Sequence, residues 1–386
     1  MARVGRRSRW KRVAGFVVVV AALVTLGLIL TVGPAKRTPS RDTPHPHEAV
    51  TPTLSAGYPD TVLEAQLTAI ASRAPARVGI FAKNLENGAY ARVNPNERIP
   101  LLSVVKLPVA IFVLEGVDSG RWSLSTPITL LPGDMHPRGE LGDRYPHGGG
   151  PVPIHRLLKL MIERSENSAA DVLMRLVGGP SAVTQWLERH GIHDFRVDRN
   201  ERELGNDWYG LPSGADTMGS AEDIRQQRAR VVPAVHDSAA QAMLLDPRDT
   251  GTAEACVQLL ERLWRGEFLS VASTDTLKSM LADCETGKDR LPGQLPRGTL
   301  VAHKTGTGGT TAGVTVGIND IGVIRLPNGD DVAIAVLVGE PRGTIPRAER
   351  VIARVARTVF DAWGGVDSTG RREWRASGST APRGTN

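Results

Sequence analysis

Segments with the pattern of β-strands lie near the two ends of the main body of the chain, and helical patterns fill the sequence between them. Five strands are predicted, at 77–85, 89–93, 299–304, 313–326 and 331–339. Apolar residues with helical spacing mark 60–72, 103–116, 154–164, 169–177, 180–190, 221–230, 238–245, 252–264, 273–283 and 346–363. We therefore expect an α/β (α+β) fold, in which an antiparallel sheet built from both ends of the body is flanked by helices and contains an inserted all-helical lobe.

Two stretches have neither pattern. Residues 126–153 contain scattered glycines and prolines and are predicted to form a loop, and residues 196–220 are polar, charged and irregular. A connection as long as the second stretch is a candidate functional loop. Residues 215–243 look like an insertion, and the sequence suggests no function for them. A cleft is expected where the sheet and the helical lobe meet.

The N-terminus has the composition of an export signal or a membrane anchor. Basic residues precede an uncharged apolar stretch from Val13 to Val32, which is long enough to cross a bilayer core of about 30 Å as a helix. The small residues of Gly33-Pro34-Ala35 would instead suit a cleavage site. Both interpretations place the body outside the cytoplasmic membrane, periplasmic or extracytoplasmic, with membrane contact only through this segment.

Composition divides the chain into four segments. Residues 1–35 are the predicted signal peptide or anchor, 36–58 a linker rich in Pro and Thr, 59–365 the folded body and 366–386 a disordered tail. Within the body, the sheet lobe is expected to comprise 59–98 and 290–365, and the helical lobe 99–289.

The net charge of +6 belongs to the ends of the chain. Residues 1–37 carry eight Lys and Arg and no acid, and residues 366–386 carry four Arg against Asp367 and Glu373. Once +8 and +2 are removed from +6, the remaining body has a net charge of −4. A mildly acidic body argues against a nucleic-acid-binding function.

The two cysteines, Cys256 and Cys284, are expected in a compartment where a disulfide can persist. The helices at 252–264 and 273–283 can form an antiparallel hairpin, and a turn near residue 270 would place the two cysteines opposite each other. We therefore predict a disulfide between them, with two buried free thiols as the alternative.

A hydroxyl and an amine stand three residues apart at the start of an apolar helical run. Ser103 and Lys106 lie on one face if this run is helical. A neighbouring lysine can activate a serine hydroxyl when burial or nearby cations keep the amine partly neutral. Taken alone, Ser103 is better explained as a helix cap, and the case for chemistry depends on the rest of the sequence.

Three further elements can carry chemistry. Ser165-Glu166-Asn167 begins a predicted helix, Arg199 to Leu204 lies in the irregular stretch, and His303-Lys304-Thr305-Gly306-Thr307 ends a strand. Each also has a structural explanation, as a helix cap, a solvated loop and a strand entering a turn, respectively.

Together and in this order, the elements resemble the Ser-x-x-Lys, Ser-Asp-Asn and Lys-Thr-Gly motifs of class A serine β-lactamases and penicillin-binding proteins. The resemblance covers most of residues 58–364. The late strands, with Asn319-Asp320 and Pro327-Asn328-Gly329, are similar to the extended-spectrum branch of class A. The resemblance implies hydrolysis of a small-molecule β-lactam and therefore antibiotic resistance.

The resemblance also implies a role for each matching residue. Ser103 is the nucleophile, and the N–H groups of Ser103 and Thr307 hold the oxyanion. Lys106 and Glu201 are alternative bases for acylation. Ser165 relays a proton to the leaving nitrogen and Lys304 tunes it. Substrate binding falls to Asn167, Thr305, Gly306 and Thr307.

Glu201 distinguishes an enzyme that hydrolyses its substrate from a protein that only becomes acylated by it. The acyl-serine ester persists unless a base activates water to attack it. Arg199-x-Glu201-x-x-Leu204 matches the family's Arg-x-Glu-x-x-Leu-Asn except that Gly205 replaces the Asn that helps to hold the water. Glu166 replaces the Asp of the second motif, which is tolerable if its side chain points away from the cleft. In addition, no arginine follows Lys304 within 306–313.

Two alternatives remain at this point. One is a D,D-carboxypeptidase or related penicillin-binding protein that acts on peptidoglycan, and the other is a β-lactam sensor domain that stays acylated. No organic cofactor is expected, and no metal, because metal-ligand spacings such as His-Glu-x-x-His do not occur. The expected form is a monomer.

Overall fold

The computed structural model describes residues 57–212 and 219–365. The predicted N-terminal apolar segment, most of the linker and the C-terminal tail lie outside the described residues. Among the helices that are described, none is both long and apolar enough to cross a membrane.

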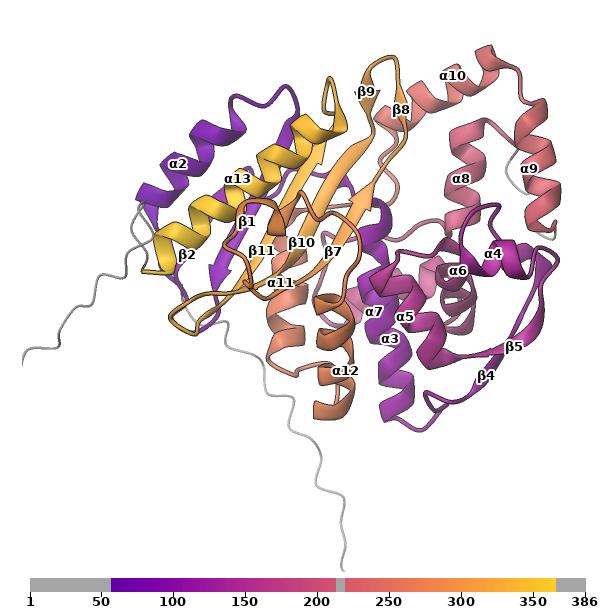
Figure 1. Cartoon of the computed structure of the whole chain (residues 1–386), viewed down its shortest axis with the longest axis horizontal. Coiled ribbons are helices and arrows are strands. Elements are labelled where there is room, and N and C mark those ends of the chain that lie inside the picture. Colours follow the sequence, from indigo (N-terminus) through magenta and orange to yellow (C-terminus); the bar gives the residue numbers. More distant parts are fainter. Residues whose placement is uncertain (1–56, 213–218, 366–386) are drawn as a thin grey trace, which may run out of the picture. The chain divides into compact units, whose positions relative to one another are not determined.

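A five-stranded sheet with the order β2-β1-β11-β10-β7 forms the centre of the fold (Figure 1). The strands are β1 (Arg77–Asn84), β2 (Tyr90–Val93), β7 (Val301–Thr307), β10 (Gly317–Arg325) and β11 (Asp331–Gly339). Each hydrogen-bonded pair is antiparallel. Because β1 pairs directly with β11, the first and last strands of the body meet in the middle of the sheet. This confirms the predicted sheet built from both ends of the sequence.

Alternating side chains along β1 and β11 bury the two faces of the sheet in different layers. Ile80 and Val336 face a core formed with α2 (Thr61–Ala71) and α13 (Ile345–Trp363), which lie next to each other across one face (Figure 1). Phe81 faces the larger core on the other side. There α11 (Ala253–Trp264) packs against the sheet, although it was expected to belong to the helical lobe.

The remaining elements build the helical region and its connections. The helices are α3 (Lys106–Asp118), α4 (Glu140–Arg144), α5 (Ile154–Glu163), α6 (Asn167–Leu176), α7 (Pro180–Arg189), α8 (Glu201–Tyr209), α9 (Ala221–Arg230), α10 (Pro233–Ala242) and α12 (Val271–Ala282). Short strands pair as β3 (Ile99–Pro100) with β6 (Thr250–Gly251), β4 (Pro127–Leu130) with β5 (Gly149–Pro153), and β8 (Thr310–Thr311) with β9 (Val314–Thr315). The 3-10 turns are η1 (Leu102–Val105), η2 (Pro132–Asp134), η3 (Met243–Leu245) and η4 (Leu291–Gln294).

Two loop predictions were wrong. The stretch 126–153 contains the β4–β5 pair and α4. These strands tolerate Pro127, Pro151 and Pro153 because a two-stranded pair consists of edge strands, where proline is permitted. The stretch 196–220 contains α8, which begins with a capping box: the Asn200 side chain accepts from Glu203 N, and the Glu203 carboxylate accepts from Asn200 N. Capping and tertiary contacts, rather than an apolar stripe, stabilise this polar helix.

Candidate active site

Ser103 lies in the 3-10 turn η1, immediately before α3, whose first residue is Lys106. The Lys106 Nζ lies 3.0 Å from the Ser103 Oγ. The Lys106 side chain is fully buried. The predicted pairing of hydroxyl and amine is therefore present, with a tight 3-10 turn in place of the first turn of the expected helix.

The sheet fixes the chain just before the nucleophile. The buried Asn319 of β10 donates from Nδ2 to the carbonyls of Pro100 and Leu101, at 2.8 and 3.3 Å. A Cβ at Gly306 would lie less than 3.0 Å from the Leu101 carbonyl oxygen, so glycine lets β7 approach this turn closely. Both contacts place Ser103 against the end of β7.

Ser165 and Asn167 approach Lys106 from the start of α6. The Lys106 Nζ donates to the Ser165 carbonyl at 2.7 Å and to the Asn167 Oδ1 at 2.6 Å. Glu166 is the N-cap residue of α6, so Ser165 is not the helix cap that the sequence allowed. Ser165 instead has a φ of 58°, a left-handed conformation that is uncommon for a residue with a side chain.

The Lys304 amine meets the same serine from β7. Its Nζ donates to the Ser165 Oγ at 3.0 Å and to the Thr305 carbonyl at 3.1 Å. Complete burial, together with repulsion from Lys106, lowers the pKa of Lys304 to about 7. The hydroxyl of Ser165 thus lies between two lysines, since Lys106 Nζ is also 3.3 Å away.

Glu201 is the first residue of α8, and its backbone is held by Asp171 of α6. The Asp171 carboxylate accepts from Glu201 N at 2.8 Å and from Arg202 N at 3.0 Å. The Glu201 Oε1 lies 3.0 Å from the Lys106 Nζ. It accepts no well-directed hydrogen bond there, so it retains the capacity to accept one from water.

The distance between Glu201 and Ser103 is limited by Lys106, which contacts both side chains. Because the Glu201 Oε1 and the Ser103 Oγ each lie 3.0 Å from the Lys106 Nζ, they are at most about 6 Å apart, within the span of one bridging water. The structure therefore brings residues near 103, 165, 201 and 304 into one site, as the motifs predicted.

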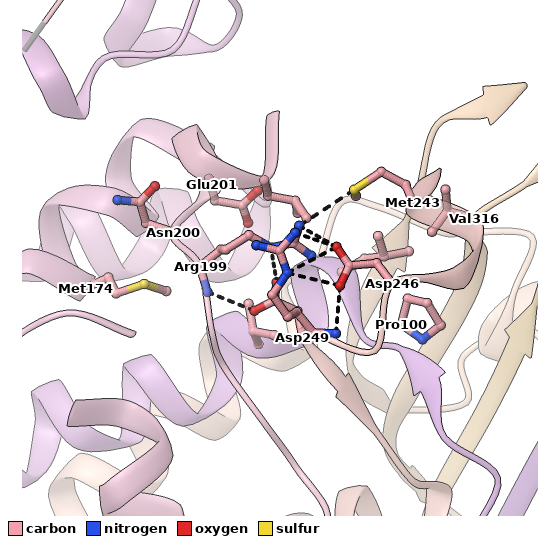
Figure 2. A pocket seen from close by; sticks show the side chains of 13 residues that line it. Pro100, Met174, Arg199, Asn200, Glu201, Met243, Asp246, Asp249 and Val316 are labelled. Carbon is pink, nitrogen blue, oxygen red and sulfur yellow. Dashed lines mark hydrogen bonds and ion pairs between the residues drawn. The ribbon is translucent and has the colours of Figure 1, made fainter. Parts of the chain in front are cut away.

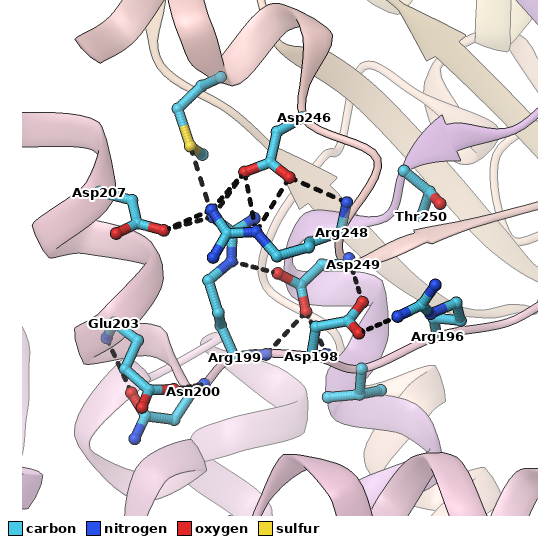
Figure 3. A network of polar contacts seen from close by, with 12 residues as sticks. Arg196, Asp198, Arg199, Asn200, Glu203, Asp207, Asp246, Arg248, Asp249 and Thr250 are labelled. Carbon is cyan, nitrogen blue, oxygen red and sulfur yellow. Dashed lines mark hydrogen bonds and ion pairs between the residues drawn. The ribbon is translucent and has the colours of Figure 1, made fainter. Parts of the chain in front are cut away.

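A buried arginine anchors the segment that carries Glu201 (Figure 3). The Arg199 guanidinium contacts three carboxylates, Asp249 at 2.6 Å, Asp207 at 2.7 Å and Asp246 at 2.9 Å. A cavity of about 20 Å³ lies beside it, with Glu201 and Met243 in its walls (Figure 2). Such a volume holds roughly one water molecule.

Arg290 is a site residue that the sequence analysis missed. Its Nη2 donates to the Thr307 Oγ1 at 2.7 Å, and its Nη1 to the Gly306 carbonyl at 3.1 Å. It therefore places a buried cation beside Thr307, although no arginine follows Lys304 in 306–313. No local pattern could have identified it, because it comes from the loop before η4. On the other side, the Thr305 Oγ1 contacts the Thr286 Oγ1 at 2.7 Å.

Glu166, which replaces the usual Asp of the second motif, bonds to α4. Its Oε2 accepts from Glu140 N at 2.8 Å. The hydrogen bonds around Lys106 and Lys304 are therefore formed without its carboxylate.

The predicted disulfide was wrong, because both cysteines are free thiols. Cys256 is completely buried in the core on α11, and this burial raises the pKa of its thiol. Cys284 follows α12 and points to Thr286, with its Sγ 3.3 Å from the Thr286 Oγ1. Burial raises the pKa of the Cys284 thiol, but the hydrogen bond and charge of His303 outweigh it, so that the pKa is lowered overall.

Within 57–212 and 219–365 no group of His, Cys, Asp and Glu could hold a metal ion.

Comparison with known proteins agrees with this geometry. A model of the beta-lactamase enzyme family matches residues 62–363. Beta-lactamase VEB-1 of Pseudomonas aeruginosa is 28% identical over 288 residues, which cover 74% of this chain and 85% of that protein. The extended-spectrum beta-lactamase PER-1 of the same species is 29% identical over 306 residues, 78% of this chain and 86% of that protein. The crystal structure of a beta-lactamase from Chitinophaga pinensis matches with a TM-score of 0.66 at 29% identity, covering 78% of this chain and 99% of that chain.

Proposed function

The chain belongs to the beta-lactamase enzyme family, and from that premise we propose that Ser103, Lys106, Ser165, Glu201 and Lys304 carry its reaction. The enzyme is a class A serine β-lactamase. It hydrolyses the β-lactam ring of penicillin- and cephalosporin-type antibiotics and thereby confers resistance.

Acylation begins when the Ser103 Oγ attacks the lactam carbonyl carbon and gives up its proton. The Lys106 Nζ, 3.0 Å away, is the nearest acceptor once it has passed a proton to Glu201. A water between Ser103 and Glu201 offers the second route. In both routes the proton reaches the Glu201 carboxylate, so this residue acts in acylation as well as in deacylation.

The other residues bind the substrate and complete the proton transfer. The backbone N–H groups of Ser103 and Thr307 hold the developing oxyanion. Ser165 gives its hydroxyl proton to the leaving nitrogen and is reprotonated from the neighbouring lysines, whose amines lie 3.0 and 3.3 Å from its Oγ. Asn167 holds the amide of the substrate side chain, while Thr305, Gly306 and Thr307 bind the substrate carboxylate with Arg290 behind them.

Deacylation returns the enzyme to its starting state. Glu201 is a carboxylate again once the proton it received in acylation has returned through Lys106 to Ser165. It then takes a proton from water, the water oxygen attacks the ester carbon, and the bond to the Ser103 Oγ breaks as that oxygen regains the proton from Glu201. The observation that carries this proposal is the position of the Glu201 carboxylate, 3.0 Å from the amine that also contacts Ser103. Penicillin-binding carboxypeptidases share the other motifs but lack this glutamate, and a sensor that stays acylated needs no deacylating base.

Trapping the acyl-enzyme tests the proposal. The protein without residues 1–35 is mixed with nitrocefin, and intact mass is followed over time for wild type, Glu201→Ala and Glu203→Ala. We expect rapid turnover by wild type and a persistent adduct on Ser103 in Glu201→Ala. Glu203 caps the same helix without contacting Lys106, so its variant should retain turnover. Stable acylation of the wild type would instead indicate a penicillin-binding protein or a sensor.

We further propose that the N-terminal segment exports or anchors the enzyme, so that a monomeric catalytic body lies outside the cytoplasmic membrane. Fractionation of cells expressing the full chain, with mass determination of the N-terminus, separates a cleaved signal from a retained anchor. Light scattering of the body tests the monomer.

A further inference from the structure

A buried histidine contacts the carboxylate that holds the first turn of α8. His136 lies between η2 and α4, and its Nε2 is 2.8 Å from the Oδ2 of Asp171 on α6. The exposed fractions of the two side chains are only 6% and 4%. Because a carboxylate only accepts hydrogen bonds, the imidazole donates from its Nε2.

The Asp171 carboxylate connects this ring to the backbone of Glu201. Its Oδ1 accepts from Glu201 N at 2.8 Å, and its Oδ2 accepts from Arg202 N at 3.0 Å. These N–H groups begin α8 and have no acceptor within the helix. The Oδ2 atom is also the one that contacts His136. The ring, the carboxylate and the start of α8 therefore form one continuous series of contacts.

Backbone contacts hold His136 in place against the same two helices. Its N–H donates to the Ser168 Oγ of α6 at 3.0 Å. The carbonyl of the preceding residue, Met135, accepts from the Arg202 Nη2 of α8. The ring thus approaches Asp171 from a backbone that is already fixed relative to α6 and α8.

Asp171 depends on His136 for its one side-chain donor. A buried carboxylate is costly unless it is hydrogen-bonded, and the ring supplies the donor that does not come from α8. Asp171 also lines a cavity of about 550 Å³, which is large enough for several water molecules. Without the ring, water would compete with the N–H groups of α8 for the carboxylate, and the first turn of α8 would lose its fixed position.

We propose that His136 is a positioning residue that keeps the Glu201 carboxylate aligned with the deacylating water by holding Asp171. The inference rests on the proposed function and adds to it a residue outside the motifs. His136 neither gives nor takes a proton in the reaction. Deacylation is the sensitive step, because a misplacement of about 1 Å can cost about 100-fold in rate. Acylation is less sensitive, since Lys106 contacts both Ser103 and Glu201 directly.

Separate measurement of acylation and deacylation in His136→Leu tests the proposal. The burst of nitrocefin hydrolysis reports acylation, and intact mass reports the adduct on Ser103 and its decay. We expect deacylation to slow about 10- to 100-fold, with a smaller loss in acylation, so that the adduct accumulates. His190→Leu is the matched control, because it removes a partly buried ring whose Nδ1 contacts a carbonyl of its own helix, α7. It should leave both rates unchanged.

Two amide variants test whether the Nε2 contact itself matters. The amide nitrogen of glutamine is three bonds from its Cβ, as is the Nε2 of histidine, whereas that of asparagine is only two bonds away. His136→Gln should therefore retain most of the wild-type deacylation rate, and His136→Asn should accumulate the adduct. Both variants keep a polar side chain, so this comparison remains available if His136→Leu does not fold.

A double variant separates positioning of Glu201 from general stabilisation. If His136 acts through Glu201, adding His136→Leu or His136→Asn to Glu201→Ala should not slow the residual deacylation further. A purely structural contribution would slow deacylation equally with and without Glu201.

Four results would overturn the inference: unchanged deacylation in both His136→Leu and His136→Asn, equal losses in acylation and deacylation, equal losses in the two amide variants, or a further loss in the double variant. Each leaves the proposed function intact as long as Glu201→Ala still accumulates the adduct. Failure of Glu201→Ala to accumulate it would instead refute the proposed function.

Discussion

The Glu201 carboxylate and the Lys106 amine lie 3.0 Å apart, although they come from the starts of different helices, α8 and α3. Both side chains are almost completely buried, with exposed fractions of 8% and 0%. The same amine contacts Ser103, so one nitrogen connects the nucleophile to the acid. A proton can therefore move between the residues of acylation and those of deacylation without large side-chain motion.

Replacing Lys106 tests this connection. Lys106→Met keeps an apolar stem of similar length but removes the amine that contacts Ser103 and Glu201. We expect acylation by nitrocefin to fall about 10²- to 10⁴-fold, the range for loss of a general base. Stopped-flow absorbance measures the rate. Lys159→Met, which removes a half-exposed amine paired with Glu163 on α5, is the control, and a near-normal burst in Lys106→Met would contradict the prediction.

Lys304 makes stability depend on pH. Burial lowers the pKa of its amine in the folded protein to about 7, from 10.5. Between these values the unfolded chain holds a proton that the folded protein does not, so the free energy of unfolding rises with pH, by at most about 1.4 kcal/mol per unit. The cost of protonating the buried amine is complete below pH 7 and disappears near pH 10.5.

The variant Lys304→Met removes this dependence and loses activity. It should be more stable than wild type at pH 6, because it avoids burying an ammonium, and this advantage should shrink at pH 9.5. Thermal denaturation of both proteins at the two pH values measures the difference. An advantage that grows with pH would mean that the amine is not neutralised in the folded protein.

The sequence predicted the parts of the site that are local in the chain. Ser103 and Lys106 are three residues apart, and the strand pattern that leads to Lys304 is continuous, so periodicity and motif order were sufficient. Arg290 could not be found in this way, because it reaches the site from another segment and only the folded chain places it there. Helix α8 was missed for a related reason. Its sequence is polar, and the contacts that stabilise it include the carboxylate of Asp171 on α6.

Arg199 is expected to stabilise the fold around Glu201. Its guanidinium is buried among the carboxylates of Asp207, Asp246 and Asp249 (Figure 3). Arg199→Ala would leave Asp249 without its cation, whereas Asp207 and Asp246 would keep Arg248. Breaking a buried ion pair costs about 3–5 kcal/mol. Chemical denaturation of both proteins measures the change in the free energy of unfolding.

Arg196→Ala is the matched control, because Arg196 lies three residues away and its side chain, paired with Asp198, is 51% exposed. Exposed ion pairs contribute at most about 1 kcal/mol. Equal losses in the two variants would mean that the Arg199 network does not stabilise the protein more than a surface pair does.

The two cysteines should differ in reactivity. Since the thiolate is the form that reacts with iodoacetamide, the lowered pKa of Cys284 favours alkylation, whereas burial raises the pKa of Cys256 and shields its Sγ. We expect the native, unreduced protein to take up one label, on Cys284, and the unfolded protein to take up two. Peptide mapping identifies the labelled residue, and Cys284→Ser should take up none in the native state.

A disulfide would give a different result, because unreduced protein would then remain unlabelled even after unfolding. Labelling of Cys256 in the native state would show that α11 exposes its buried face.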